Sequence, residues 1–384
     1  MIIPLLALGV VGYAYVGYPL LLAVAARTRR PRPLPPMGPS WPSITVVVPV
    51  FNGEGTIGAA LECILASDYR GPRQVLVVSD GSRDGTDRVV AGYASLGVEL
   101  VSLPERVGKT EAENRTLDRI RGEIVINTDA SVRVHPAAIT ALVRALADPE
   151  VGVASSTDVS VRTTAQANEG ETSYVDYEMR LRALETRVAG IVGASGSLYA
   201  IRASLNRRVL PAHLSRDFSA ALYAREQGFR AVSVPEAVCY VPRGSGGRAE
   251  YQRKVRTMAR GLKTLWYHRR LLDPFRYGVF AWMLLSHKLL RWLTPAALVL
   301  AVVTFVFPDG PAWSRWAVGL GLGWAALGWW WPGDETPRIV ALPAYALGGV
   351  VAGLHAWWRA LRGEMLAVWE PTRRAATTPR GGRA

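Results

Sequence analysis

The sequence predicts an α/β domain with a mostly parallel β-sheet flanked by helices, joined to transmembrane α-helices toward both ends of the chain. Short β-branched runs alternate with helical stretches over residues 43–245. Long apolar segments lie on either side of that region, and basic residues gather beside those segments. Short apolar runs are typical of buried parallel strands, and basic clusters next to apolar segments are typical of membrane proteins.

The first element is an apolar segment over residues 2–26 that contains no charged side chain. At about 1.5 Å per residue, a helix of this length crosses a hydrocarbon core of about 30 Å. A cleaved signal peptide is the alternative, because Ala23-Val24-Ala25 resembles a cleavage site, but no basic region precedes the apolar stretch. We predict a transmembrane helix over 1–26, followed by a stiff, basic, proline-rich linker over 27–42.

The central region, residues 43–245, is expected to fold as one α/β domain. Helical stretches separate short apolar runs, a spacing that implies right-handed βαβ units. About 200 residues are enough to form one hydrophobic core. The predicted strands are 44–50, 74–79, 98–102, 123–127 and 151–155.

The remainder of the chain again resembles a membrane protein. Residues 246–293 are rich in basic and aromatic side chains and predict amphipathic helices at the membrane interface. Apolar segments then predict a transmembrane region over 294–358, followed by a basic tail over 359–384. Three crossings after the first helix would place that tail outside, against the positive-inside rule. Either one segment is re-entrant or residues 275–293 also cross the membrane.

Composition narrows the class of partner. The 384 residues include 45 Lys and Arg against 31 Asp and Glu, which gives a net charge of +14 beside a hydrophobic content of 49%. The excess lies in patches that border apolar segments; residues 241–276 hold ten basic and two acidic side chains. This distribution favours membrane lipids as partners and argues against nucleic acid. The two cysteines, Cys63 and Cys239, make no disulfide framework, and we expect both to be buried.

Polar residues follow three of the predicted strands. Asn52 and Glu54 come after the first, Asp80 after the second and Asp129 after the fourth. In an open α/β sheet the ligand site lies beyond the carboxyl ends of the strands. Carboxylates there can accept hydrogen bonds from a base or ribose, or ligate a divalent cation that neutralises a pyrophosphate. Each also has a structural interpretation, since Asp80-Gly81 suits a turn and Asp84 suits a helix cap.

Several other motifs are incomplete. Gly108-Lys109-Thr110 resembles the end of a P-loop, but position 103 holds Leu where that pattern begins with Gly. No G-x-G-x-x-G follows the first strand, which argues against a dinucleotide dehydrogenase. Residues 193–197 do not fit the G-x-S-x-G elbow of hydrolases. The apolar segments also lack the polar residues of a transporter.

Four motifs in order resemble a family 2 glycosyltransferase, over roughly residues 44–260. With the flanking membrane segments, the chain is similar to bacterial polysaccharide synthases of the hyaluronan, poly-N-acetylglucosamine and cellulose synthase type. The resemblance implies a Rossmann-like GT-A fold and inverting transfer of a sugar from a nucleotide-sugar donor to a polysaccharide or lipid-linked acceptor at the cytoplasmic face of the cell membrane. A UDP-linked sugar is the expected donor. The motifs are Val46 to Glu54, Val77 to Thr86, Gly108 to Asn114 and Gly122 to Ser131.

The resemblance also implies roles for residues around the donor nucleotide. Asn52 and Glu54 match positions that line the nucleotide pocket, and Asp80 matches the aspartate that reads the uracil or ribose. Lys109 and Asn114 match positions that help to hold the nucleotide.

Asp129 matches the first aspartate of the family's D-x-D motif, which binds the donor diphosphate through Mg²⁺ or Mn²⁺. The third position departs from the motif, because it is Ser131. One carboxylate, with a hydroxyl or water and two phosphate oxygens, can still hold Mg²⁺, since that ion usually keeps several waters.

Two further segments match the family's catalytic loops. Ser195, Gly196 and Ser197 resemble the loop that supports the donor sugar and the acceptor. Asp217 resembles the general base, which takes the acceptor's hydroxyl proton in an inverting transfer. The alternative for Asp217 is a helix N-cap.

Processive synthases of the family carry a Q-x-x-R-W motif after this point, and this chain has only part of it. Arg253 and Arg256 share a helix face and are expected to reach the pyrophosphate, with lipid headgroups as the alternative ligand. The missing residues leave two other hypotheses open. One is a single transfer to a membrane lipid, and the other is an inactive relative that serves as a scaffold of a polysaccharide export complex.

Overall fold

The computed structural model describes residues 2–30, 32–38, 40–162, 169–243, 247–306, 312–330 and 338–364. The chain divides into two compact units whose segments alternate along the sequence. The first unit comprises Met1–Arg32, Asn168–Val192 and Gly246–Leu366. The second comprises Pro33–Ala167, Gly193–Ser245 and Ala367–Ala384.

The second unit is built on one sheet, to which the described residues contribute eight strands in the order β3-β2-β1-β4-β7-β6-β8-β5. The neighbours β3, β2, β1 and β4 run parallel, whereas β7 is antiparallel to both β4 and β6. The sheet is therefore mixed, but β6 and β8 also pair in parallel, so the predicted mostly parallel character holds for all the described strands except β7 and β5. The strands are β1 (Ile44–Val50), β2 (Arg73–Ser79), β3 (Val98–Ser102), β4 (Ile124–Thr128), β5 (Arg133–Val134), β6 (Val151–Arg162), β7 (Leu198–Arg202) and β8 (Arg230–Arg243).

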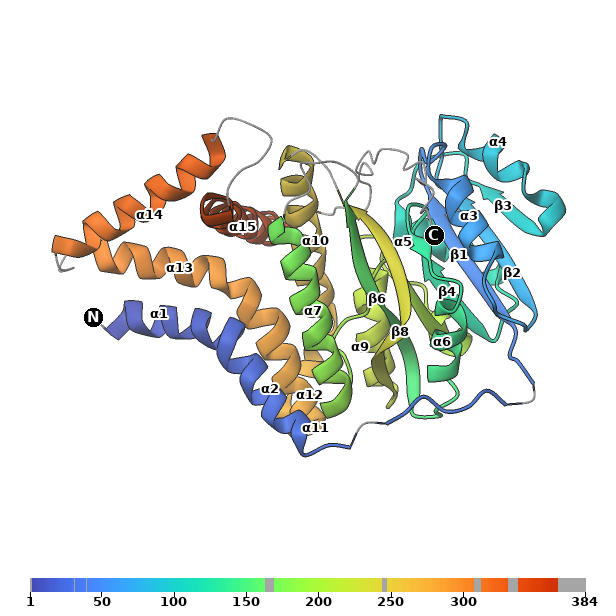
Figure 1. Ribbon diagram of the computed structural model, residues 1–384, viewed down its shortest axis with the longest axis horizontal. Helices are drawn as coiled ribbons and strands as arrows, with labels where there is room; N and C mark the ends of the chain where they lie inside the picture. The colour runs from blue at the N-terminus through green and yellow to red at the C-terminus, as the bar shows by residue number, and fades with distance from the viewer. Residues whose placement is uncertain are drawn as a thin grey trace, which may run out of the picture. The chain divides into compact units, whose positions relative to one another are not determined.

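Helices cover this sheet on its two faces (Figure 1). One face carries the main apolar core, where alternate residues of β1 such as Val46 and Val48 pack with Leu61 of α3 and Leu142 of α6. The helices α5 and α9 contribute the polar side chains described below. The helices of this unit are α3 (Ile57–Leu65), α4 (Thr86–Ala91), α5 (Lys109–Asn114), α6 (Ala138–Ala145), α8 (Ala203–Asn206) and α9 (Arg216–Glu226), with short 3₁₀ turns at Ala94–Leu96 and Leu117–Arg119.

The predicted strands are confirmed to within a residue at β1 to β4. The runs of β1, β2 and β4 are buried almost throughout, which leaves little ambiguity, whereas β3 is only partly buried. Strand β6 extends to Arg162, well beyond its predicted end at residue 155. Of the cysteines, Cys239 is buried as expected, whereas Cys63 is only partly buried, and both are free.

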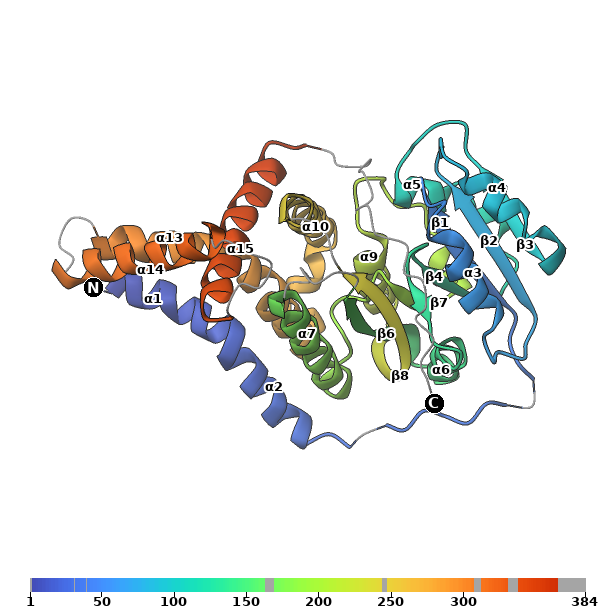
Figure 2. The same ribbon diagram turned by 45° about the horizontal axis from the view of Figure 1, so that its top comes forward.

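The first unit is helical. Within it α1 packs against α13, α2 against α7, and α15 against both α10 and α14. Figure 2 shows α1 running on into α2 as one continuous helix. The α-helices are α1 (Ile2–Gly12), α2 (Tyr18–Arg27), α7 (Glu169–Val188), α10 (Gly247–Tyr267), α11 (Pro274–Tyr277), α12 (Val279–Leu284), α13 (Arg291–Val306), α14 (Ala312–Trp330) and α15 (Arg338–Leu361), with π-helical segments at Tyr13–Gly17 and Leu285–Leu290 and a 3₁₀ segment at Arg269–Leu272.

Two helices among the described residues are long and apolar enough to cross a membrane, Ile2–Arg27 and Val279–Val306. The second runs unbroken through residues 293 and 294, where the sequence predicts an interface helix giving way to a membrane segment. This continuity corresponds to the alternative in which residues 275–293 belong to a crossing segment. Of the expected basic tail, residues 365–384 lie outside the described residues.

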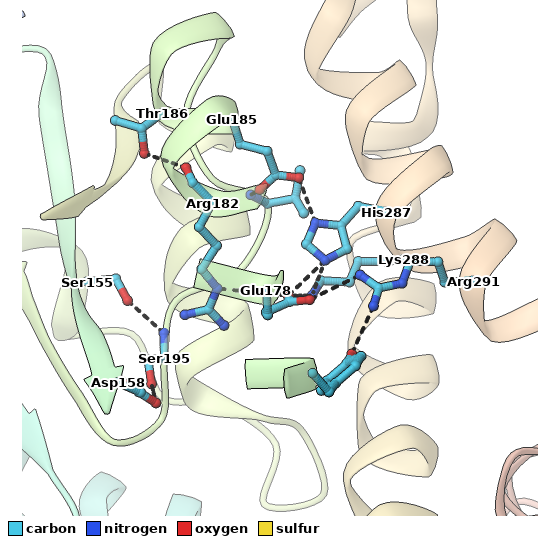
Figure 3. Close-up of polar contacts among 12 residues, drawn as sticks. Ser155, Asp158, Glu178, Arg182, Glu185, Thr186, Ser195, His287, Lys288 and Arg291 are labelled. Carbon is cyan, nitrogen blue, oxygen red and sulfur yellow. Dashed lines mark hydrogen bonds and ion pairs between the residues drawn. The ribbon is translucent and has the colours of Figure 1, made fainter. Parts of the chain in front are cut away.

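The expected single domain over 43–245 is interrupted, because α7 belongs to the first unit. Its Glu178 and Glu185 lie within hydrogen-bonding distance of the two ring nitrogens of His287, at 2.8 and 2.6 Å, and Glu178 also pairs with Arg291 at 3.0 Å (Figure 3). Tyr18 donates to Glu185 at 2.7 Å. The polar side chains of the segment around residue 287 are thus satisfied inside the helical unit.

Candidate active site

The loops after β1 and β2 are joined by the side chains of Asn52 and Glu54. Asn52 Oδ1 accepts a hydrogen bond from the Arg83 N–H at 2.8 Å, and Glu54 Oε2 accepts one from the Gly85 N–H at 3.0 Å. Asn52 has a positive φ of 48°, a conformation that asparagine tolerates better than most residues. The two side chains therefore link the loops that follow the neighbouring strands β1 and β2.

Asp80 fixes the entry to α5. It is 5% exposed, and its two oxygens accept hydrogen bonds from the backbone N–H groups of Val107 at 2.7 Å and Gly108 at 2.9 Å. Gly81 has a φ of 65°, so the predicted turn is present. Asp84 accepts from the Thr86 N–H at 3.1 Å just before α4, although the N-cap residue of that helix is Gly85 and not Asp84.

Lys109 and Asp129 form an ion pair at the strand-end crevice. The Lys109 Nζ lies 2.6 Å from Asp129 Oδ1, and the Asp129 side chain is 40% exposed. Burial alone would lower the pKa of Lys109, but the carboxylates of Asp129, Glu113 and Asp217 outweigh burial and hold that pKa above its ordinary value. The site therefore carries a fixed positive charge beside an accessible carboxylate.

The strand pairing brings Asp129 to the predicted loop over Ser195, Gly196 and Ser197. Because Thr128 of β4 pairs with Leu198 of antiparallel β7, the residue after β4 lies opposite the residue before β7. The Ser197 carbonyl accepts from the Asp129 N–H at 3.3 Å and from Thr128 Oγ1 at 2.8 Å.

Asp217 lies on the other side of this loop. A Cβ added to Gly196 would stand 2.8 Å from Asp217 Oδ2, so the carboxylate lies directly against the Gly196 backbone. Asp217 is in the first turn of α9, and Ser215 is the N-cap residue and donates a hydrogen bond to Asp217 Oδ1. The alternative role of Asp217 as the helix N-cap is therefore wrong.

Asn114 connects α5 to the segment before α9. Its amide donates to the Leu210 carbonyl at 2.7 Å and accepts from the Leu210 N–H at 3.1 Å. Arg216 also donates to its side-chain oxygen. Through these contacts Asn114 holds α5 to the segment before α9 and to α9 itself.

The sequence patterns do not mark a buried ion pair between Glu113 and Arg216. Their side chains are 3% and 5% exposed, and Arg216 Nε lies 3.0 Å from Glu113 Oε2. Burial raises the pKa of Glu113, although Lys109 and Arg216 oppose this effect. The sequence patterns also do not mark Asp158, a buried carboxylate on β6. No local pattern marks either residue, because Asp158 follows the polar residues Ser156 and Thr157 and Glu113 stands in an ordinary polar helix.

Arg253 and Arg256 lie on α10, in the first unit, apart in sequence from the residues above. Burial and the neighbouring Arg260 and Arg253 lower the pKa of Arg256 to about 10. Such mutual repulsion favours an anionic ligand, of which both a pyrophosphate and a lipid headgroup are examples.

The residues present fit a metal ion that arrives with a diphosphate. Among the described residues no three His, Cys, Asp or Glu side chains are grouped to hold a metal. Asp129 offers one accessible carboxylate, and one of its oxygens contacts Lys109. Mg²⁺ is commonly bound through one or two carboxylates together with substrate phosphates and water.

The chain is similar to known proteins over this region. Residues 45–208 match the family model described as Glycosyl transferase family 2. An N-acetylglucosaminyltransferase of Mesorhizobium japonicum is 31% identical over 237 residues, which is 55% of this chain and 54% of the relative. One from Rhizobium meliloti is 30% identical over 239 residues, with 56% and 53% covered. The chain thus spans about half the length of these curated relatives.

A solved structure is similar over nearly the whole chain. It is a mannosyltransferase from Pyrobaculum calidifontis in complex with GDP-Man and Mn²⁺, which aligns with 94% of this chain and 99% of its own at a TM-score of 0.70 and 24% identity. This likeness confirms the predicted GT-A type of fold.

Proposed function

We propose that this chain transfers a sugar from a nucleotide-sugar donor to an acceptor, with inversion at the anomeric carbon, because residues 45–208 match the model of glycosyl transferase family 2. One observation carries the proposal. Asp217 lies against the Ser195–Gly196–Ser197 loop, and Asp129, which pairs with Lys109, bonds to the same loop through its backbone N–H. This shared contact supports our assignment of a base beside a diphosphate site.

The proposed chemistry needs one base and a stabilised leaving group. Asp217 takes the proton of the acceptor hydroxyl as that oxygen bonds to the anomeric carbon, while the bond from that carbon to the diphosphate oxygen breaks. Lys109 lies where its ammonium group can stabilise the negative charge of the departing diphosphate. A direct displacement of this kind needs no covalent enzyme intermediate.

Asp129 is the proposed protein ligand of a divalent cation, Mg²⁺ or Mn²⁺. Such an ion would neutralise charge on the donor diphosphate. The mannosyltransferase of similar fold was solved with Mn²⁺, which supports a divalent cation without distinguishing the two ions.

We propose that the donor nucleotide binds at the strand ends followed by Asn52, Glu54 and Asp80, with Asn114 holding α5 to the segment before α9. A UDP-linked sugar is our proposed donor. UDP-N-acetylglucosamine is the first candidate, because the curated relatives are named N-acetylglucosaminyltransferase.

The proposed acceptor is a polysaccharide or a lipid-linked glycan at the cytoplasmic face of the cell membrane. Two candidate membrane-spanning helices support a multi-pass membrane protein whose catalytic domain is cytoplasmic. Single transfer to a membrane lipid is the second candidate, because α10 carries Arg253 and Arg256 without a complete Q-x-x-R-W motif. The arrangement of Lys109, Asp129 and Asp217 argues against an inactive scaffold.

The test is turnover by the detergent-solubilised full-length chain. We expect release of nucleoside diphosphate from a panel that includes UDP-N-acetylglucosamine and GDP-mannose, with Mg²⁺ or Mn²⁺ and with or without lipid extract. Asp217→Asn should abolish turnover and retain nucleotide binding. If no donor yields nucleoside diphosphate and Asp217→Asn is indistinguishable from the wild type, the proposal that the chain is an enzyme is wrong.

Asp80→Ala separates binding from chemistry. Loss of the two backbone contacts at Val107 and Gly108 should weaken nucleotide binding, measured by calorimetry, because the entry to α5 is no longer held. If Asp217→Asn weakens nucleotide binding and Asp80→Ala does not, the two roles assigned here are reversed.

A further inference from the structure

Asp158 on β6 is a buried carboxylate that accepts hydrogen bonds from the loop before β7 and from its own strand. The residue is 8% exposed. Its Oδ2 accepts from Ser195 Oγ at 2.6 Å and from Ser197 Oγ at 2.9 Å, and its Oδ1 accepts from Ser156 Oγ at 2.9 Å. Cys239 Sγ lies 3.4 Å from Oδ1. Burial, and then the Asp158 charge, raise the pKa of this thiol well above its ordinary value, so it stays a donor.

The two oxygens face different neighbours. Oδ1 faces strand residues of β6 and β8, through Ser156 and Cys239. Oδ2 faces both serines of the loop, and Figure 3 shows its contact with Ser195. The Ser195 N–H in turn donates to Ser155 Oγ at 2.8 Å. The loop is therefore tied to β6 by side chains rather than by regular strand pairing.

The loop in turn contacts both acidic residues of the proposed chemistry, Asp129 through its backbone N–H and Asp217 through its carboxylate. The Ser197 carbonyl receives the Asp129 N–H, and the Gly196 backbone lies against Asp217 Oδ2. A shift of Ser195 and Ser197 would move these two contacts together. Reacting groups lose rate steeply when they are misplaced by about 1 Å.

We propose that Asp158 is a positioning residue of the transferase site, which fixes the Ser195–Gly196–Ser197 loop and, through that loop, sets Asp129 and Asp217 relative to each other. The inference rests on the proposed function. The hydrogen bonds given above join Asp158 to the loop and to its own strand, so its substitution should affect the rate of the chemical step more than the affinity for donor.

The first test compares two ways of removing these hydrogen bonds in the full-length, detergent-solubilised chain. Asp158→Asn removes the anionic acceptor, and the double variant Ser195→Ala/Ser197→Ala removes the donors from the loop side. Each should lower kcat about 10- to 100-fold with the donor KM within about twofold of the wild type. Combining them should give no further loss, because both break the same contacts. If Asp158→Asn does not fold, the serine variant decides the question alone.

Ser156→Ala is the matched control. It removes a hydrogen bond of similar length from the same carboxylate without touching the loop. A positioning role predicts a kcat within about twofold of the wild type for this variant. Equal losses for Ser156→Ala and for the serine double variant would show that Asp158 serves only the packing of β6 and β8, and would overturn the inference.

Hydrogen exchange supplies a readout that is independent of turnover. Asp158→Asn should speed exchange in peptides covering 193–200 and 126–132, whereas Ser156→Ala should leave 126–132 unchanged. Unchanged exchange over 126–132 in Asp158→Asn would contradict the link to Asp129. If the wild type transfers no sugar, the proposed function fails, while this exchange pattern still decides whether Asp158 holds the loop.

Discussion

At the scale of single residues, the site depends on close approach at Gly196. Its missing side chain allows the Asp217 carboxylate to lie against the loop backbone. No other amino acid leaves that space free, so the carboxylate position and the loop position are fixed together.

We expect Gly196→Ala to lower kcat about 100-fold, since a Cβ 2.8 Å from Asp217 Oδ2 must displace the proposed base. Steady-state nucleoside diphosphate release is the measurement. Gly38→Ala is the control, because a Cβ there meets nothing closer than 4.0 Å. Equal activity of the Gly196→Ala variant and the wild type would contradict the placement of Asp217.

At the scale of elements, the ion pair between Glu113 of α5 and Arg216 of α9 joins the helices that carry Lys109 and Asp217. We expect Glu113→Gln to cost about 3 kcal/mol in the free energy of unfolding, because it leaves the Arg216 charge buried without its partner. Denaturant titration measures this change.

The control for that experiment is Arg115→Gln. Arg115 pairs with Glu111 at the surface of the same helix, with side chains 39% and 33% exposed. Exposed pairs contribute little, so the loss should stay below about 1 kcal/mol. Equal losses for the two variants would show that the buried pair carries no special weight.

In the helical unit, we expect the Glu178 carboxylate to make the free energy of unfolding depend on pH. Burial would raise the pKa of Glu178 on α7, but His287, Lys288 and Arg291 outweigh it and hold that pKa well below 4.5. Arg182, on the same helix, lies 3.9 Å away. As the pH falls, the unfolded chain takes up the proton first, so the stabilisation is complete above about pH 4.5 and is lost as the pH falls toward the folded pKa.

Melting temperatures between pH 7 and pH 3.5 test this linkage. The wild type should lose stability below about pH 4.5. Glu178→Gln should be less stable at neutral pH and should show a smaller loss over the acidic interval. Identical acid profiles for the two proteins would exclude Glu178 as the source.

At the scale of the whole molecule, we expect the chain to remain with the membrane after alkaline carbonate extraction, because two long apolar helices lie in separate parts of the sequence. Protease added to intact spheroplasts should leave residues 43–245 uncut, and protease added to inverted vesicles should cut within them. Cleavage from the outside would contradict the proposed cytoplasmic orientation.

Local physics made part of the structure predictable. The strands β1 to β4 are β-branched runs, and polar residues follow where strands end, so Asn52, Asp80 and Asp129 could be placed at one sheet edge from the sequence. The roles of Ser195, Gly196, Ser197 and Asp217 came from the resemblance to the family rather than from their local pattern.

Other features depended on contacts between residues far apart in the chain. Glu113 and Arg216 are separated by about a hundred residues, and no local pattern marks them as partners. Helix α7 reads as part of the central domain until Glu178 and Glu185 are seen to pair with His287. The sequence by itself determined the strands β1 to β4, the two long apolar helices and the strand-end carboxylates, because these follow from local burial and turn chemistry. Only the tertiary structure decided which carboxylates share a loop and which helix joins which unit, because those follow from long-range packing.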